Sequence, residues 1–231
     1  MNSTRRDGTA ASSSKTPLTD GGGPRVELRK LSIINQLAMV GVDGMNDELA
    51  GVGENGSARL HLRQVDFFDV LERHAEVGDE KVVGIRARLK DVPGGHLLLL
   101  FEPGGAQYLA QLLIEDESRA EGNTADGGRI SEREAQKFVG HIGDMMLGGF
   151  IGGWENALGR EIGHESPKIL YSSADDLVRE AADAGDNLAA LHFYTQLQFD
   201  TGGSERADVD TSIYAFPDNE VFAELLNALG K

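Results

Sequence analysis

The stretch that decides the fold is residues 131–167, whose sequence reads SEREAQKFVGHIGDMMLGGFIGGWENALGREIGHESP. Its apolar residues recur at the three- and four-residue spacing of an amphipathic helix. Ser131 and Glu134 form the pattern of a capping box, which predicts where the helix begins. Gly159 is the predicted C-terminal cap. We therefore expect one long helix over residues 131–158.

This predicted helix contains six glycines, and each costs about 1 kcal/mol against alanine in a helix interior. Close approach of another backbone would offset that cost. A matching helix is expected over residues 31–52, where Gly41 and Gly44 are also small; a partner protein is the alternative source of the contact. The six glycines are Gly140, Gly143, Gly148, Gly149, Gly152 and Gly153.

A polar stripe follows one face of the predicted helix, because His141, Asp144, Gly148 and Glu155 are spaced by three, four and seven residues. We expect this stripe to be exposed to solvent or to touch a partner. The simplest interpretation of His141 and Asp144 is an ion pair on a solvated surface.

A metal pair formed by His141 and Asp144 is an alternative interpretation, but it lacks an evident third ligand. His164 and Glu165 lie beyond the end of the helix and would join the pair only if the following loop folded back.

The chain reads as two halves that repeat one order of elements: a long helix, a further short strand or helix segment, a pair of strand-like runs, a turn and a closing helix. The strand pairs are joined by short polar connections, which favours antiparallel pairing and an α+β fold. We expect a disordered tail over residues 1–25 and a single domain over residues 26–231. That domain divides into a first half (26–115), a linker (116–129) and a second half (130–231). The expected strands are 82–89 and 96–101 in the first half, and 187–199 and 209–216 in the second.

The chain of 231 residues has a net charge of −16, which excludes nucleic acid as a partner because phosphate neutralisation needs a basic patch. An anionic membrane surface is disfavoured for the same reason. The absence of cysteine excludes disulfides, thiolate metal sites and cysteine nucleophiles. The excess of 38 acidic over 22 basic residues favours a halophilic protein, adapted to high salt, and an ordinary acidic protein is the alternative.

No apolar run approaches the roughly 18 residues that span a bilayer, so we expect no membrane insertion. Residues 1–25 lack the apolar segment of a signal peptide. We therefore expect a cytoplasmic protein.

Several segments, taken in order, resemble one known family. In the second half, His141 and Asp144 are followed by Pro167 after 22 intervening residues. The other matching segments are 31–38 (LSIINQLA), 65–70 (VDFFDV), 95–101 (GHLLLLF) and 149–154 (GFIGGW).

This ordered set resembles the chemotaxis phosphatase family of CheC, CheX and FliY over residues 26–231, and especially archaeal CheC. The resemblance implies an α+β fold with internal two-fold pseudo-symmetry, in which two long helices pack together and each helix can carry one site. It also implies the family activity, which is hydrolysis of the aspartyl phosphate of the response regulator CheY.

In the family, the helix carries Glu-x-x-Asn with a proline at the distance of Pro167. The asparagine amide is thought to orient the attacking water, and the glutamate contacts a lysine of the regulator. Here His141 replaces the glutamate and Asp144 replaces the asparagine. Asp144 retains an acceptor oxygen but has lost the amide donor. At the first site the aligned residues are Gln36 and Met39, with Arg63 in place of the proline, and that site is expected to be inactive.

Two functions remain open on this basis. In the first, the chain docks on CheY or its adaptors with degenerate phosphatase sites. In the second, it is a weak CheY phosphatase, a hydrolase, that acts through Asp144 and His141. Further partners implied by the resemblance are CheD and archaellum adaptor proteins. No cofactor is implied, since magnesium would be supplied by the regulator.

Overall fold

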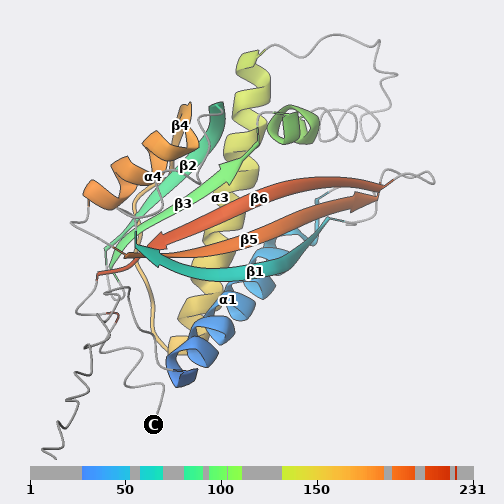
Figure 1. Ribbon diagram of the computed structural model, residues 1–231. Coiled ribbons are helices and arrows are strands. Elements are labelled where there is room, and N and C mark those ends of the chain that lie inside the picture. Colours follow the sequence, from blue (N-terminus) through green and yellow to red (C-terminus); the bar gives the residue numbers. More distant parts are fainter. Residues whose placement is uncertain are drawn as a thin grey trace, which may run out of the picture.

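In the computed structural model, six strands form one antiparallel sheet, and two long helices pack against one of its faces (Figure 1). The described residues are 28–52, 58–69, 81–90, 94–102, 104–110, 132–184, 189–200, 206–218 and 222. The predicted tail, the predicted linker and the capping-box residue Ser131 lie outside these ranges.

The two long helices are α1, Leu28–Leu49, and α3, Glu132–Leu158. Both predicted helices are confirmed, with α1 displaced slightly toward the N-terminus. Gly159 follows α3 with a φ of +64°, a left-handed conformation that glycine adopts without steric cost. The predicted C-terminal cap of α3 is therefore confirmed.

The four strands predicted from sequence are present and form two hairpins, β2 with β3 and β5 with β6. The order across the sheet is β1-β5-β6-β3-β2-β4. The strand bounds are β1, Arg59–Asp69; β2, Lys81–Leu89; β3, Gly95–Phe101; β4, Lys168–Ser173; β5, Ala189–Asp200; and β6, Arg206–Phe216.

The sheet order shows the internal symmetry of the chain. If β1, β2 and β3 are exchanged with β4, β5 and β6, the order reads the same from the opposite edge. Each hairpin is bordered by the first strand of the other half: β4 pairs with β2, and β1 pairs with β5. Both halves therefore contribute to one sheet, and the predicted duplicated unit is confirmed.

The two long helices cross at equivalent glycines. A Cβ atom on Gly44 would lie 2.1 Å from the carbonyl oxygen of Gly149, and a Cβ atom on Gly149 would lie 2.4 Å from that of Gly44. A Cβ atom on Gly153 would lie 2.0 Å from the carbonyl oxygen of Val40, so the helices run antiparallel. Backbones this close leave no room for any side chain, which explains these glycines.

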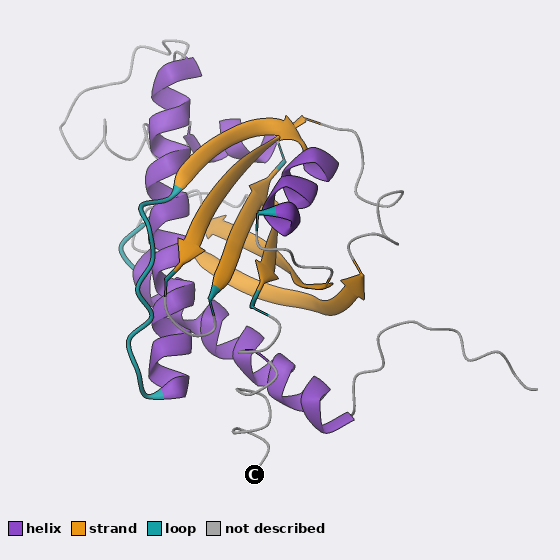
Figure 2. Ribbon diagram, turned by 90° about the vertical axis from the view of Figure 1, so that its left-hand side faces the viewer, coloured by secondary structure: helices purple, strands orange, loops and turns teal. Residues whose placement is uncertain are grey.

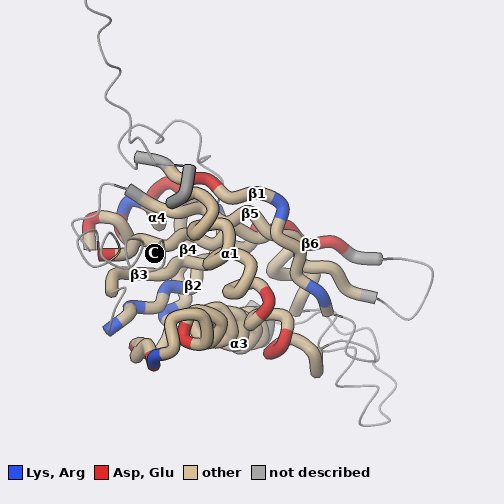
Figure 3. Tube along the Cα trace, turned by 90° about the horizontal axis from the view of Figure 1, so that it is seen from below, with Lys and Arg blue, Asp and Glu red and all other residues tan. Residues whose placement is uncertain are grey.

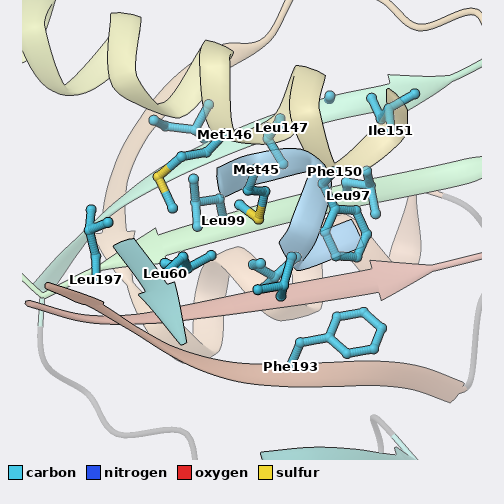
Figure 4. Close-up of a cluster of buried hydrophobic side chains, with 14 of the residues drawn as sticks. Met45, Leu60, Leu97, Leu99, Met146, Leu147, Phe150, Ile151, Phe193 and Leu197 are labelled. Carbon is cyan, nitrogen blue, oxygen red and sulfur yellow. The ribbon is translucent and has the colours of Figure 1, made fainter. Parts of the chain in front are cut away.

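The main core lies between the helix pair and the sheet (Figure 4). A shorter helix, α4, spans Ala174–Asp183 and covers part of the opposite face through a second apolar cluster (Figure 2). Its N-cap is Ser173, whose hydroxyl accepts from the amide of Asp176. None of the helices in the described ranges combines the length and the apolar character needed to cross a bilayer.

Residues 104–110 form the helix expected to close the first half, and Phe222 is helical in the corresponding segment of the second half. The sequence predicted an unspecified short element after each long helix. The structure shows that this element is a strand in both halves, β1 and β4.

Candidate functional site

His141 and Asp144 are exposed on the side of α3 that faces away from the sheet. The intervening residues Ile142 and Gly143 are buried, and a Cβ atom on Gly143 would collide with the side chain of Ile85 in β2. Helical spacing therefore turns His141 and Asp144 outward, as predicted for the polar stripe.

The expected ion pair between His141 and Asp144 is not formed. Among the described residues, neither side chain has a hydrogen-bonding or ionic partner. An exposed ion pair gains little over the hydration of its separate charges, so nothing forces the two side chains together. Both groups are consequently available to an incoming molecule.

The rest of the stripe is only partly open. Gly148 has no atom within 4 Å of the position that its Cβ would occupy. Glu155 is half-buried, and its Oε1 accepts a hydrogen bond of 2.6 Å from the amide of Ile162. The carboxylate of Glu155 thus anchors the loop after α3 instead of facing a partner.

The six glycines of α3 have three different surroundings. Gly149 and Gly153 meet the backbone of α1, as expected, whereas Gly140 and Gly143 meet the side chains of Ile169 and Ile85. Gly148 and Gly152 contact nothing within 4 Å on the exposed side of the helix. Close packing inside the chain therefore accounts for four of the six glycines.

The segment after Pro167 passes beside the turn of α3 that carries His141. Pro167 immediately precedes β4, and the Cδ1 atom of Ile169 lies 2.4 Å from the position of a Cβ on Gly140. The distant Pro167 is therefore brought to the level of the polar pair by β4.

The loop before Pro167 does not fold back to His141. The amide of Lys90 donates to the carbonyl of Gly163 at 2.7 Å, and His164 forms a β-bridge with Leu89. Glu165 lies 3.9 Å from Arg88. Within the described part of the chain, no three histidine, aspartate or glutamate side chains are grouped closely enough to hold a metal ion.

The first predicted site lies on the exposed side of α1. Gln36 and Met39 are both exposed, and Met39 retains 58% of its accessible surface. Gln36 precedes His141 by 105 residues, the same separation that relates the crossing glycines Gly44 and Gly149. The pseudo-symmetry therefore places Gln36 and Met39 in the positions of His141 and Asp144.

The proline position differs between the halves. Arg63 lies inside β1, at a register irregularity between Leu62 and Gln64, and its guanidinium donates to the side-chain oxygen of Gln196. Pro167, by contrast, lies outside β4. The segment facing α1 is consequently a continuous strand rather than a proline-terminated loop.

Charges are spread over both long helices, with acidic positions on each (Figure 3). On α1 the residues equivalent to the open Gly148 and Gly152 are Asp43 and Asp47, both exposed. Exposed carboxylates are therefore present on both long helices, and a cationic group of a partner would be attracted to them.

A cluster of charged side chains around the buried His96, on the opposite face of the sheet, was missed by sequence reasoning. Arg86 of β2 lies 3.0 Å from Glu180 of α4. His96 of β3 is 8% exposed, and its pKa is lowered by burial and by the neighbouring Arg86 and Arg88. Strand alternation could have placed Arg86 and Arg88 on one face, but the covering helix α4 is visible only in the fold.

Comparison with known proteins finds a relative in sequence and similar folds among solved structures. No family model matches the chain. The chain is 29% identical over 207 residues to a Halobacterium salinarum protein named "Putative CheY-P phosphatase CheC1", covering 88% of this chain and 98% of that protein.

Two solved structures are similar in fold. Thermotoga maritima FliY has a TM-score of 0.63 at 13% identity, covering 86% of this chain and 96% of FliY. The FliM middle domain of H. pylori has a TM-score of 0.53 at 13% identity, covering 88% of this chain and 99% of that domain. At this identity the likeness concerns the fold alone, and it confirms the α+β architecture expected from the sequence.

Proposed function

We propose that this chain, a CheC-like chemotaxis protein, docks on the response regulator CheY through the exposed side of α3 and acts mainly by binding. The Halobacterium salinarum relative is named for an action on CheY-P, and it aligns over nearly its whole length. The observation that carries the proposal is the exposed pair His141 and Asp144, which has no partner among the described residues and has the segment after Pro167 beside it.

Hydrolysis is expected to be weak because of the chemistry of Asp144. Phosphoryl transfer asks the protein mainly for positioning and charge stabilisation. An ionised Asp144 accepts hydrogen bonds but donates none, and its negative charge repels a phosphoryl group. Met39 at the equivalent position of α1 has no group that holds water by a strong hydrogen bond.

A weak phosphatase is the second candidate function, and one observation favours it. The Asp144 carboxylate has no internal partner among the described residues, so its oxygens are free to accept a hydrogen bond from a water molecule. His141, when protonated, would offset part of the negative charge beside the phosphoryl group.

The docking proposal is tested by restoring the family residues at the second site. The double variant His141→Glu, Asp144→Asn should gain phosphatase activity toward phosphorylated CheY. Its matched control is Gln36→Glu, Met39→Asn at the pseudo-equivalent positions of α1, where Arg63 replaces the proline and little gain is expected. Phosphate decay is followed at the salt concentration of the native cytoplasm, with the wild-type chain alongside.

The outcomes separate the two functions. Wild-type chain that binds CheY without speeding phosphate loss supports docking, whereas faster phosphate loss with the wild-type chain supports the weak phosphatase. No binding to either form of CheY would remove both functions. We further propose CheD and archaellum adaptors as partners to be sought by co-purification, and we assign the magnesium ion to the regulator.

A further inference from the structure

Two large apolar side chains are exposed on β4, beside the polar pair of α3. In the described residues, the exposed large hydrophobic side chains are Leu31, Met39, Ile169 and Tyr171, and the last two belong to β4. Ile169 is 40% exposed and Tyr171 is 51% exposed. β4 is also an edge strand, so its outer side has no neighbouring strand within the described part of the sheet.

The packing of Ile169 fixes where this apolar edge lies. Ile169 pairs with Ile85 across the sheet, and these two side chains occupy the space that a Cβ on Gly140 or Gly143 would need. Gly140 immediately precedes His141 in α3. The exposed part of Ile169 therefore borders the turn of the helix that carries His141.

Tyr171 extends the same edge toward the N-terminus of α3. Residues two apart in a strand point to the same face, so Tyr171 shares the face of Ile169, whereas Leu170 packs into the cluster under α4. The segment that leads into β4 is bonded at Ile162 to Glu155 and reaches Gly140 at Ile169, so the strand continues toward earlier residues of α3 (Figure 1).

Lys137 lies on that earlier turn. It is exposed, four residues before His141 and seven before Asp144, so the three side chains follow one side of α3. Among the described residues Lys137 has no ionic partner. In a chain of net charge −16, it is a cation on the same side of α3 as Asp144, two helical turns away.

We infer that the docking surface of α3 is bipartite: Ile169 and Tyr171 bind an apolar strip of the phosphorylated response regulator, and Lys137 contacts its phosphoryl group. This inference rests on the proposed function. Ile169 and Tyr171 supply affinity for the regulator, and Lys137 supplies preference for its phosphorylated form. The surface is continuous with His141 and Asp144, and a dianionic group that approaches Asp144 needs a cation nearby.

High salt makes the apolar part necessary. At about 1 M salt the Debye length is about 3 Å, so exposed charges contribute little to affinity. Burial of apolar surface is not screened and is strengthened by excluded salts. A protein adapted to salt therefore requires contacts of the kind that Ile169 and Tyr171 provide.

The test measures binding of the full chain to the response regulator of the same organism, with and without beryllofluoride, a mimic of aspartyl phosphate. Tyr171→Ser and Ile169→Ser are each expected to weaken binding to both forms by about tenfold at about 1 M salt. The matched control is Leu31→Ser, because Leu31 is 39% exposed but lies on α1. It should leave the affinity within about twofold of wild type.

Thermal unfolding of each variant shows whether it is folded, and Tyr171→Ser removes the more exposed side chain in case Ile169→Ser disturbs the packing on Gly140. Affinity that is unchanged by Tyr171→Ser, with wild-type binding intact, would overturn the apolar part of the inference. Absence of wild-type binding would instead overturn the proposed function, so the two failures are distinguishable.

The second arm uses Lys137→Ala, with Lys168→Ala as its control. Lys168 is exposed on the face of β4 that does not carry Ile169 and Tyr171, and it pairs with Arg86 of the neighbouring strand β2. Lys137→Ala should reduce the preference for the beryllofluoride form by about fivefold at low salt and by less at about 1 M salt. A loss that is equal for both forms, or no loss, would show that Lys137 does not contact the phosphoryl group.

Discussion

The indole Nε1 of Trp154 donates a hydrogen bond of 2.9 Å to the backbone carbonyl of Leu37. This bond joins α3 to α1 inside their own interface, where Trp154 is 1% exposed and its ring lies 5.0 Å from that of Phe150. It fixes the rotation of one long helix relative to the other, and therefore which side chains of each helix face solvent.

Replacement of Trp154 tests this relationship. Trp154→Phe should lower the free energy of unfolding by about 1–3 kcal/mol, because the buried carbonyl of Leu37 then loses the indole N–H that donates to it. Trp154→Ala should cost about 3–5 kcal/mol, because it also opens a cavity. Denaturant unfolding followed by far-UV circular dichroism measures both values, and equal stability of Trp154→Phe and wild type would show that the bond contributes nothing.

Gly44 of α1 and Gly148 of α3 should respond to alanine in opposite directions. Gly44→Ala would place a Cβ 2.1 Å from the carbonyl oxygen of Gly149, and a backbone atom cannot move aside cheaply, so we expect a loss of about 1–3 kcal/mol. Gly148→Ala meets open space and should gain up to about 1 kcal/mol from helix propensity. Thermal and urea unfolding compare the two variants, and a stable Gly44→Ala chain would refute the close crossing.

Asn46 should be a strong link between α1 and β1. Its Nδ2 donates to the carbonyl of Leu60 at 3.0 Å, and its Oδ1 accepts from the amide of Leu60 at 2.7 Å. Asn46→Ala removes both bonds and should destabilise the chain by about 1–3 kcal/mol. Asn46→Asp keeps the acceptor and should lie between Asn46→Ala and wild type, whereas the exposed neighbour Asp47→Ala should stay within about 0.5 kcal/mol.

His96 should make stability depend on pH. Burial, together with Arg86 and Arg88, holds the pKa of His96 below its ordinary value of 6.5. Between the lowered folded-state pKa and 6.5 the unfolded chain binds more protons than the folded chain, so the free energy of unfolding falls as the pH falls through 6.5. Full stability from this group is present above pH 6.5.

His96→Gln removes that titration while it keeps a polar side chain at this buried position. The difference in unfolding free energy between wild type and His96→Gln should therefore shrink or reverse as the pH is lowered from 8 to 5. Urea unfolding at constant salt measures it. A difference that is constant over this range would contradict the prediction.

Much of the local structure was predictable because it depends on nearby residues. The bounds of α3 follow from apolar spacing and from Gly159, whose positive φ ends the helix. The hairpins follow from strand-like runs joined by turn residues, and the outward direction of His141 and Asp144 follows from their offset from Ile142. Each of these features depends only on residues that lie close together along the chain.

Other features involve partners that are remote along the chain. Gly140 and Gly143 were expected to meet a backbone, but their partners are side chains of Ile169 and Ile85. The prediction of an ion pair between His141 and Asp144 was wrong, because both side chains are exposed and no packing holds them together. The covered cluster of Arg86 and His96 depends on the position of α4, which no local pattern specifies.

By itself, the amino-acid sequence determined the long helices, the hairpins, the duplicated order of elements and the outward-facing positions of His141 and Asp144. Only the tertiary structure decided that β4 carries Ile169 and Tyr171 along the part of α3 that leads to His141, and that α1 and α3 cross at Gly44 and Gly149. The physical reason is the separation of the interacting residues along the chain. Helix periodicity and turns depend on residues a few positions apart. The pairing of a strand from one half with a hairpin of the other depends on the core that both halves share.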